Sequence, residues 1–260
     1  MSVAEPTSVP KPNFGVNDTP LRRFAVLAAI KLLKRIRPRI GNVLFLTDKL
    51  CVKYGPLKPL SEAFTLHFVA NHTTIPVPKV YCAFVHNGWT YTVMERIKGE
   101  AIANTWHSRS GESKAKILAQ LREMVKEWRK LPPPGPGVAH VGGGPLYDGR
   151  LPGTSLTFGP FKTIQDFHSF LRNGHRARPD HIPEINNMIS LQDRPWPMPV
   201  FTHGDLSSFN IIVRGDEVVG IIDWETAGWY PSYWEYTTFL EPMPQELEME
   251  KIRQRYFGDF

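Results

Sequence analysis

The sequence predicts an α+β protein of two lobes, in which a small β-rich first half is followed by a larger helical second half. Three observations support this prediction. β-branched and apolar runs gather before residue 97, amphipathic helical patterns dominate after it, and one further hairpin lies late in the chain. With 260 residues, 42% of them hydrophobic, the chain can bury a core in one large domain or two lobes.

The positive charge of the chain is concentrated in one segment. The net charge is +6, yet residues 22–39 alone hold seven Lys and Arg and no acidic residue. The remainder is therefore close to neutral, which argues against a general nucleic-acid-binding surface.

The cysteines and the N-terminal composition indicate a cellular compartment. Cys51 and Cys82 are the only cysteines. Two cysteines form neither a disulfide framework nor a four-ligand zinc site, which favours a reducing compartment. The first fifteen residues lack the apolar core of a signal peptide, and the apolar run at 24–30 is too short to span a bilayer. We therefore expect a soluble, cytoplasmic protein.

The N-terminal region divides into a tail and a basic helix. Residues 1–20 are rich in Pro and Ser and are predicted to be disordered. A helix is predicted over 21–36, with apolar positions on one face: Leu21, Phe24, Ala25, Leu27, Ala28, Leu32 and Ile36. Such a face usually packs on a core, here that of the first lobe. The alternative is a basic helix that lies on a membrane surface, using residues 21–39.

The first lobe is predicted to cover residues 21–97. Two short strands are expected within 42–55, followed by a helix over 60–71 that nearby prolines terminate. A hairpin is predicted over 79–99, because Asn87-Gly88 between two β-rich runs is a strong hairpin signal.

The second lobe is predicted to cover residues 98–260. It begins with an amphipathic helix over 112–131, and a loop rich in Pro and Gly follows at 132–145. Further helices are expected around 163–173 and 181–191. The crevice between two lobes is a preferred place for ligands.

Polar residues flank the late hairpin, within the segment FTHGDLSSFNIIVRGDEVVGIIDWETAGWYP that begins at residue 201. If Val213 pairs with Val218, Asn210 before one strand lies beside Asp223 at the end of the other. An amide oxygen and a carboxylate at one edge suit a hard cation such as Mg²⁺. Asp205, on the preceding loop, is left to accept a proton from a hydroxyl. This layout is typical of phosphoryl transfer.

These residues carry a resemblance to a known family. The pattern His-Gly-Asp-x4-Asn from residue 203, followed by Ile-Asp-Trp-Glu from residue 222, resembles the aminoglycoside phosphotransferases and choline kinases, which are small-molecule kinases distantly related to protein kinases. The phrases PVPKV, MERIKG, PLYDGRLP and AGWYPSYWEY are similar to fungal-type members. The resemblance runs from about residue 40 to 240 and implies a bilobal protein-kinase-like fold.

The resemblance implies roles for the residues of the second lobe. Asp205 would be the catalytic base or the carboxylate that orients the hydroxyl. Asn210 and Asp223 would hold Mg²⁺ on the phosphates of ATP, and His203 would support the loop. Gly204 stands where protein kinases have an Arg that reads a phosphorylated activation loop, so no such switch is expected.

The resemblance also implies a nucleotide site in the first lobe. Lys53 and Glu62 look like the kinase pair in which Lys contacts the α- and β-phosphates and Glu holds the Lys in place. Gly41-Asn42 is the only candidate for the turn that covers the phosphates. Four residues would form the hinge that reads adenine: Met94, Glu95, Arg96 and Ile97.

The implied activity is the ATP- and Mg²⁺-dependent phosphorylation of a hydroxyl on a small-molecule metabolite. The catalytic loop reads Ser207-Ser208-Phe209 where relatives commonly have a Pro and a basic residue. The alternative is therefore a pseudokinase that acts as a nucleotide-binding or scaffold module. Glu225 and Glu235 could bind a cationic acceptor or anchor the loop after Asp223. The sequence specifies neither the acceptor nor the oligomeric state.

Overall fold

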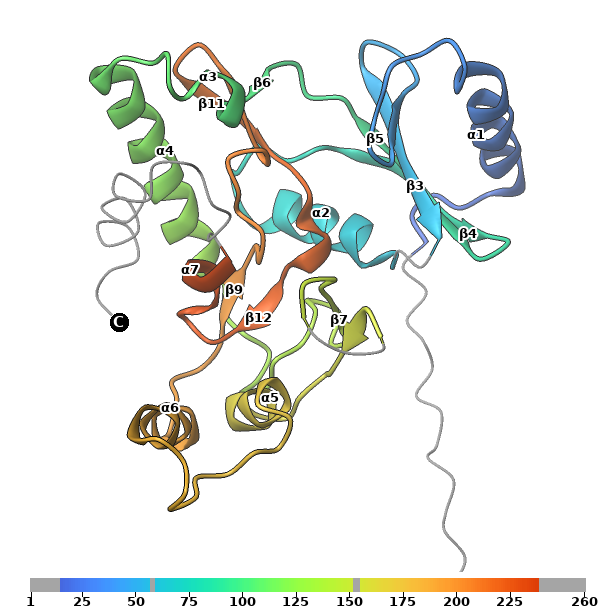
Figure 1. Cartoon of the computed structure of the whole chain (residues 1–260). Coiled ribbons are helices and arrows are strands. Elements are labelled where there is room, and N and C mark those ends of the chain that lie inside the picture. The colour runs from blue at the N-terminus through green and yellow to red at the C-terminus, as the bar shows by residue number, and fades with distance from the viewer. Residues whose placement is uncertain (1–14, 57–58, 152–154, 239–260) are drawn as a thin grey trace, which may run out of the picture.

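The computed structural model describes residues 15–56, 59–151 and 155–238 (Figure 1). A five-stranded sheet with two helices forms the first part of this described chain, and helices with three small sheets form the second part. This arrangement confirms the predicted α+β architecture, in which a small β-rich half precedes a larger half.

The five-stranded sheet is antiparallel throughout. Its strands are, in spatial order, β1 (Arg39–Ile40), β2 (Val43–Phe45), β3 (Leu50–Pro56), β5 (Trp89–Glu95) and β4 (Val80–His86). Asn87 and Gly88 join β4 to β5 with φ angles of 49° and 74°, the left-handed conformations that a two-residue hairpin turn requires. The predicted hairpin is thus confirmed.

Helix α1 (Pro20–Leu33) lies on the outer face of this sheet (Figure 1). Thr19 caps it, since its side chain accepts a hydrogen bond from the Arg22 amide, and Pro20 occupies the first turn, where no amide partner is needed. Val26 and Ile30 pack into a core with strand residues such as Leu44.

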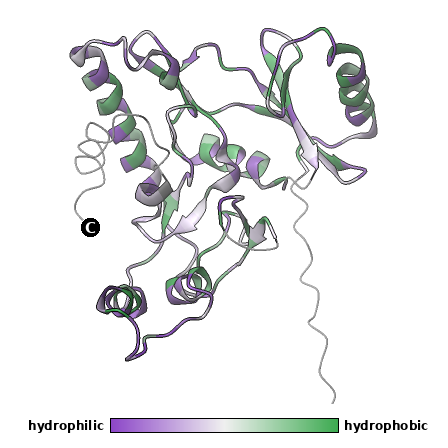
Figure 2. Cartoon of the chain, in the orientation of Figure 1, coloured by the Kyte–Doolittle hydropathy of each residue, from purple (hydrophilic) through white to green (hydrophobic). Residues whose placement is uncertain are grey.

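The prediction of which face of α1 packs on the core is wrong. Leu21, Phe24, Leu32 and Ile36 are exposed, whereas Val26 and Ile30 are buried and Ala29 and Leu33 pack beside them. The exposed and the buried apolar residues lie on roughly opposite sides of the helix, and Figure 2 shows hydrophobic and hydrophilic positions along α1. Periodicity finds both stripes, and contact with the sheet selects one of them.

The predicted disorder of residues 1–20 is wrong for residues 15–20, which the structure describes. Val16 forms a two-way backbone bridge with Ala83, with N···O distances of 3.0 and 2.9 Å, and Asn17 donates from its side chain to the Tyr81 carbonyl. Backbone pairing therefore holds this segment against β4. Residues 1–14 lie outside the described residues.

Helix α2 (Ser61–His72) connects the two parts of the molecule. Its buried Leu66 and Val69 belong to a core that includes Cys51 and Met94 of the sheet and Phe201 of the second part. The sheet and the second part therefore share one hydrophobic core, which fixes their relative position.

The second part contains short strands between helices. Its helices are α3 (Ile102–Thr105), α4 (Gly111–Arg129), α5 (Ile164–Leu171), α6 (Pro183–Asp193), the 3₁₀ turn η1 (Trp224–Thr226) and α7 (Trp234–Thr238). Its strands are β6 (Glu100–Ala101), β7 (Leu146–Tyr147), β8 (Thr157–Phe158), β9 (Val200–Thr202), β10 (Ile211–Arg214), β11 (Glu217–Ile221) and β12 (Gly228–Tyr230). Within the described ranges, no helix is both long and apolar enough to cross a membrane.

The hairpin of β10 and β11 has the predicted register. Val213 pairs with Val218, and Ile211 pairs with Ile221. Strand β6, just after the predicted hinge, adds to β10 as a third strand. Asn210 and Asp223, which flank the Ile211–Ile221 pair, are thereby brought to the same end of the hairpin.

Candidate active site

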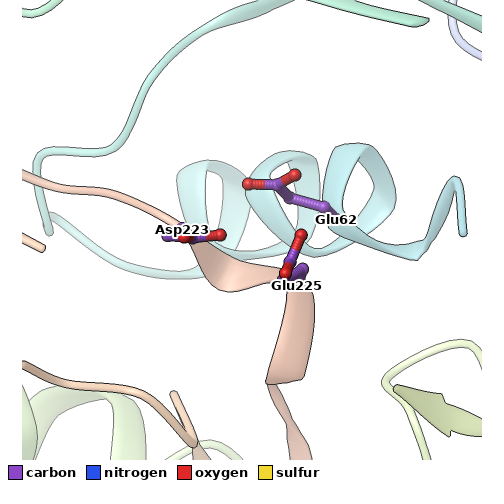
Figure 3. A group of neighbouring side chains, drawn as sticks. All are labelled: Glu62, Asp223 and Glu225. Atoms are coloured by element: carbon purple, nitrogen blue, oxygen red, sulfur yellow. The ribbon is translucent and has the colours of Figure 1, made fainter. Parts of the chain in front are cut away.

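A buried lysine lies at the centre of the candidate site. Lys53 is in β3, paired with Val43 of β2 and Thr92 of β5, and its side chain is almost fully buried. Its Nζ contacts three carboxylates: Glu62 at 2.8 Å, Asp223 at 2.6 Å and Glu225 at 2.9 Å. Figure 3 shows Glu62 reaching from α2 toward the segment that carries Asp223 and Glu225.

Charge pairing keeps this lysine protonated. Burial by itself lowers the pKa of Lys53, but Glu62, Asp223 and Glu225 hold that pKa well above its usual value. Burial raises the pKa of Glu62 to about 7, while the Lys53 charge opposes the shift. The cluster holds more carboxylates than cations, and such a surplus of negative charge favours an additional cation nearby.

The three carboxylates do not form an independent metal site. Glu62, Asp223 and Glu225 each offer an oxygen within 4.8 Å of the others, but the Lys53 ammonium contacts all three. The ammonium therefore takes the role that a metal ion would have among them.

The predicted metal ligands lie at the neighbouring edge. The Asn210 side-chain amide donates to the Asp205 backbone carbonyl at 2.8 Å and to Asp205 Oδ2 at 3.0 Å. The Ile222 amide donates to the Asn210 carbonyl at 3.0 Å, which places Asn210 beside Asp223. Because the Asn210 N–H groups point to Asp205, its side-chain oxygen is the atom that can bind a cation, at the same end of the hairpin as Asp223. Such oxygen donors fit Mg²⁺.

Asp223 has an unusual backbone conformation. Its φ and ψ angles are 64° and 57°, in the left-handed region that side-chain-bearing residues rarely adopt. This conformation costs on the order of 1 kcal/mol, and strained residues of this kind concentrate at functional sites. The Asp223 side chain stays 37% exposed even though it contacts the buried Lys53.

His203 connects the predicted catalytic loop to Ile222, which lies between β11 and Asp223. It is fully buried, and its Nδ1 accepts a hydrogen bond from the Asp205 amide at 3.1 Å. Its Nε2 must therefore carry the proton that is donated to the Ile222 carbonyl at 3.0 Å. Burial lowers the pKa of His203 to about 4, which agrees with a neutral ring that supports the loop.

Gly204 has a structural reason to be glycine. Its φ is +79°, and an added Cβ would lie 2.9 Å from the Thr226 carbonyl oxygen. The backbone conformation therefore favours glycine here, at the position where protein kinases have an arginine that reads a phosphorylated loop. Any larger residue would push the loop away from η1.

Glu235 of α7 anchors the predicted catalytic loop through its backbone amides. Its carboxylate accepts hydrogen bonds from the amides of His203 at 2.7 Å and Gly204 at 3.1 Å. Burial raises the pKa of Glu235 to about 7, and these amide bonds oppose the rise. Of the open alternatives for the two glutamates, the structure places Glu235 under the catalytic loop and Glu225 on Lys53, so neither lies free to meet a cationic acceptor.

Sequence reasoning missed Arg150, which contacts the predicted catalytic residue. Arg150 Nη1 donates to Asp205 Oδ1 at 2.9 Å, and its Nη2 donates to the Gly204 carbonyl. The only sequence signal was its place in the family phrase PLYDGRLP, to which no role was assigned.

The predicted hinge is only partly available to a ligand. Met94 lies in the paired part of β5. The Glu95 amide donates to the backbone carbonyl of Lys79 at 2.9 Å, and the Arg96 amide donates to the backbone carbonyl of Lys49 at 2.9 Å. Recognition of adenine by N–H groups of this segment is therefore left to Ile97. These amides are used by the backbone because β5 extends to Glu95 and the chain after it stays paired with the residue before β3.

The remaining predicted residues come together around Lys53 and Asp205. The turn at Gly41-Asn42 lies beside Lys53, since the Tyr54 amide donates to the Asn42 carbonyl at 3.0 Å. Asn210 contacts Asp205 directly and lies beside Asp223, which contacts Lys53. Residues from both halves of the sequence thus form one continuous polar site.

Comparison with solved structures places this fold among antibiotic phosphotransferases. A thermostable mutant of aminoglycoside phosphotransferase APH(4)-Ia, in ternary complex with ADP and hygromycin B, has a TM-score of 0.58 and 14% identity over 92% of this chain and 84% of that one. APH(3'')-Id from Streptomyces rimosus, in complex with ADP and streptomycin, has a TM-score of 0.55 and 16% identity over 94% and 93%. Macrolide 2'-phosphotransferase MphH from Brachybacterium faecium has a TM-score of 0.52 and 13% identity over 89% and 82%.

Sequence comparison identifies the family. No curated protein matches the chain. The sequence model of the phosphotransferase enzyme family, APH, matches residues 56–258, which is most of the chain and includes Glu62, Asp205, Asn210 and Asp223. The chain shares the fold of the aminoglycoside and macrolide phosphotransferases, and it belongs to the APH phosphotransferase enzyme family.

Proposed function

We propose that this protein transfers the γ-phosphoryl group of ATP to a hydroxyl of a small molecule in a Mg²⁺-dependent reaction. One observation carries the proposal: Lys53 of the first lobe contacts Asp223 of the second at 2.6 Å, while Glu62 holds the same ammonium at 2.8 Å. A fixed ammonium beside a carboxylate that can bind metal is the arrangement that positions ATP phosphates.

Asp205 is the residue we assign to the acceptor hydroxyl. In the reaction, the acceptor oxygen forms a bond to the γ-phosphorus as the bond from that phosphorus to the bridging oxygen breaks. The electron pair of the broken bond leaves with ADP, and the hydroxyl proton passes to Asp205. Asn210 and Arg150 hold the two oxygens of this carboxylate, each of which retains acceptor capacity.

Asn210 and Asp223 are the residues we assign to Mg²⁺. The metal, when bound there, would neutralise phosphate charge during the transfer. Their oxygens fit that ion in chemical type, and the carboxylate surplus around Lys53 favours a further cation. Lys53 then contributes a positive charge that does not depend on pH in the neutral range, because its pKa is held high.

The acceptor is proposed as a hydroxyl-bearing small molecule. The similar structures were solved with ADP and hygromycin B and with ADP and streptomycin, which supports a nucleotide and a hydroxylated ligand for this fold. The proposal for this chain stays at that class.

Nucleotide binding and turnover test the proposal separately. We expect Mg²⁺-ADP and Mg²⁺-ATP to raise the melting temperature of the full chain. Phosphate transfer from ATP to a panel of hydroxylated metabolites should occur with the wild type and not with Asp205→Ala. Nucleotide binding without transfer to any acceptor or to water would indicate the pseudokinase alternative. Absence of both would overturn the assignment of the site.

A further inference from the structure

Arg150 provides a positive charge that the catalytic loop itself lacks. From Asp205 to Asn210 the loop reads Asp-Leu-Ser-Ser-Phe-Asn and contains no Lys or Arg. The guanidinium of Arg150, which lies 55 positions earlier in the chain, donates to Asp205 Oδ1 at 2.9 Å. Tertiary structure therefore brings a cation to the carboxylate that we assign to the acceptor.

The position of this guanidinium is fixed by a second acid. Asp148 Oδ1 accepts from Arg150 Nε at 2.9 Å and Asp148 Oδ2 accepts from Nη2 at 2.8 Å, a bidentate pair. Asp148 is only 2% exposed, and its own amide donates to the Leu156 carbonyl at 3.0 Å. The Arg150 amide also donates to Asp148 Oδ1. Because Asp148 is buried, its bidentate pair with the part-exposed Arg150 orients the arginine more firmly than a fully exposed pair would.

The Asp205 carboxylate is consequently held at both oxygens. Arg150 donates to Oδ1, and the Asn210 side-chain amide donates to Oδ2 at 3.0 Å. Without Arg150, the hydrogen bond to Oδ1 is lost and the carboxylate is oriented less tightly. A misplacement of about 1 Å at a reacting group can lower the rate about 100-fold.

We propose that Arg150 is a positioning residue for Asp205, and that its guanidinium supplies the positive charge that residues 205–210 lack. The inference rests on the proposed phosphotransfer at this site. Arg150 acts through Asp205, and the buried Asp148, which directly follows β7, acts through Arg150.

The first test uses turnover. Arg150→Ala should lower kcat roughly 10- to 100-fold with little change in the KM for ATP, because the nucleotide end of the site is untouched. Arg150→Lys should recover part of the loss, and guanidinium ion in solution should restore Arg150→Ala but not Asp205→Asn. Arg178→Ala, which removes an exposed arginine paired with Asp180, is the matched control. Full kcat in Arg150→Ala, or a loss of kcat that guanidinium leaves unchanged, would overturn the proposal.

A second test reads the ion pair without turnover. A water-soluble carbodiimide should label Asp205 faster in Arg150→Ala than in the wild type, as followed by mass spectrometry, because the guanidinium no longer covers Oδ1. Equal labelling rates would overturn the proposal even in an inactive protein. Conversely, faster labelling in a protein that transfers no phosphate would remove the proposed function and keep the ion pair.

A separate observation concerns the outer face of α1. Three apolar side chains on this face are largely exposed: Leu21 at 77%, Phe24 at 71% and Leu32 at 73%. Their spacing places them on one side of the helix, away from the face that packs on the sheet. A patch of large apolar side chains that is exposed to solvent marks an interaction site.

The charged residues around this face indicate which kind of partner it binds. Lys31, Lys34 and Arg35 are exposed beside the apolar stripe, and no acidic residue lies between Asp18 and Asp48. A second copy of the chain would bring these cations against each other, and a nucleic acid would leave the apolar stripe without a partner. An apolar stripe with basic flanks is complementary to an anionic lipid surface.

We infer that the outer face of α1 binds anionic membrane surfaces while the helix stays packed on the first lobe. The full chain should sediment with vesicles that contain about 30% phosphatidylserine and not with neutral phosphatidylcholine vesicles. Raising the NaCl concentration from about 0.05 M to about 0.5 M should release the protein from the vesicles, because salt screens the electrostatic attraction.

Two variants locate the contact. Phe24→Gln with Leu32→Gln should weaken binding about tenfold or more, since both apolar contacts are lost. Met188→Gln with Leu191→Gln, two exposed apolar residues of α6, is the matched control and should bind like the wild type. Absence of binding at low salt, equal binding by both double variants, or a dimer that Phe24→Gln abolishes would overturn the inference.

Discussion

The two ends of the candidate site are stabilised in different ways. At the end proposed to bind the nucleotide, the buried Lys53 ammonium contacts three carboxylates that come from α2 and from the segment after β11. At the acceptor end, Asp205 is 30% exposed and is held by Arg150 and Asn210. Removing a partner from a buried charge cluster is expensive, whereas an exposed pair contributes little to stability. The nucleotide end should therefore matter for folding and for activity, and the acceptor end mainly for activity.

Replacing Asp205 gives the largest expected effect and tests the acceptor end. Asp205→Ala should lower phosphate transfer roughly 10²- to 10⁴-fold, the usual contribution of a general base. Stability should change little, because Arg150 keeps its bidentate pair with Asp148. Steady-state kinetics and thermal melting measure the two quantities. Transfer that persists at the wild-type rate would remove Asp205 from the mechanism.

Replacing Lys53 tests whether the nucleotide end supports the fold. Lys53→Met leaves Glu62, Asp223 and Glu225 without their shared cation, and the free energy of unfolding should fall by about 3–5 kcal/mol. Urea denaturation near neutral pH measures the change. Lys126→Met, which removes a lysine from the exposed pair with Glu123, is the control and should cost at most about 1 kcal/mol. Equal stability of the two variants would contradict the distinction between the two ends.

Replacing Asp223 separates its charge from its backbone strain. Asn tolerates the left-handed conformation, so Asp223→Asn removes charge while the backbone stays as it is. The affinity for ATP should fall on the order of 100-fold in the presence of Mg²⁺ and much less with EDTA, as measured by calorimetry. A loss of affinity that is the same with and without Mg²⁺ would exclude Asp223 as a metal ligand.

A buried histidine at the junction of the two lobes predicts a smaller, pH-dependent effect. His140 Nε2 lies 2.9 Å from Thr65 Oγ1 of α2, and burial lowers the pKa of His140 to about 4. Between about pH 6.5 and about pH 4, His140 is therefore protonated in the unfolded chain and neutral in the folded chain. The free energy of unfolding falls as the pH is lowered through this range. The contribution is about 2 kcal/mol between about pH 7 and about pH 5.

The slope of stability against pH measures this effect. His140→Asn should show a shallower loss of unfolding free energy on acidification than the wild type. The control is His67→Asn, an exposed position on α2, which should keep the wild-type slope. Identical slopes for all three proteins would show that His140 titrates alike in the folded and unfolded chains.

Much of the fold and part of the site could be predicted because the signals are local. Asn87-Gly88 indicates its hairpin by turn chemistry, and the β10–β11 register follows from two apolar runs joined by a short turn. That register alone places Asn210 beside Asp223. The hinge was less predictable, because the amides of Glu95 and Arg96 are used by partners at Lys79 and Lys49 that no local pattern reveals.

Arg150 and Glu235 could not be recognised for the same reason. Each contacts the catalytic loop across 31 to 55 positions of sequence, Arg150 through Asp205 and Glu235 through the amides of His203 and Gly204. Nothing in the spacing of these residues distinguishes them from an exposed arginine or a helix glutamate. Only the packed structure shows that both orient the loop.

The sequence by itself determined the order of elements, the hairpins, the family and the candidate residues for phosphotransfer, since turn chemistry, periodicity and short motifs act over a few neighbouring residues. The tertiary structure decided which apolar stripe of α1 is buried, which carboxylates share Lys53 and which cation reaches Asp205. Those outcomes depend on how distant segments pack and exchange charges, and a helix with two apolar stripes or a carboxylate with several possible partners is settled only by that packing.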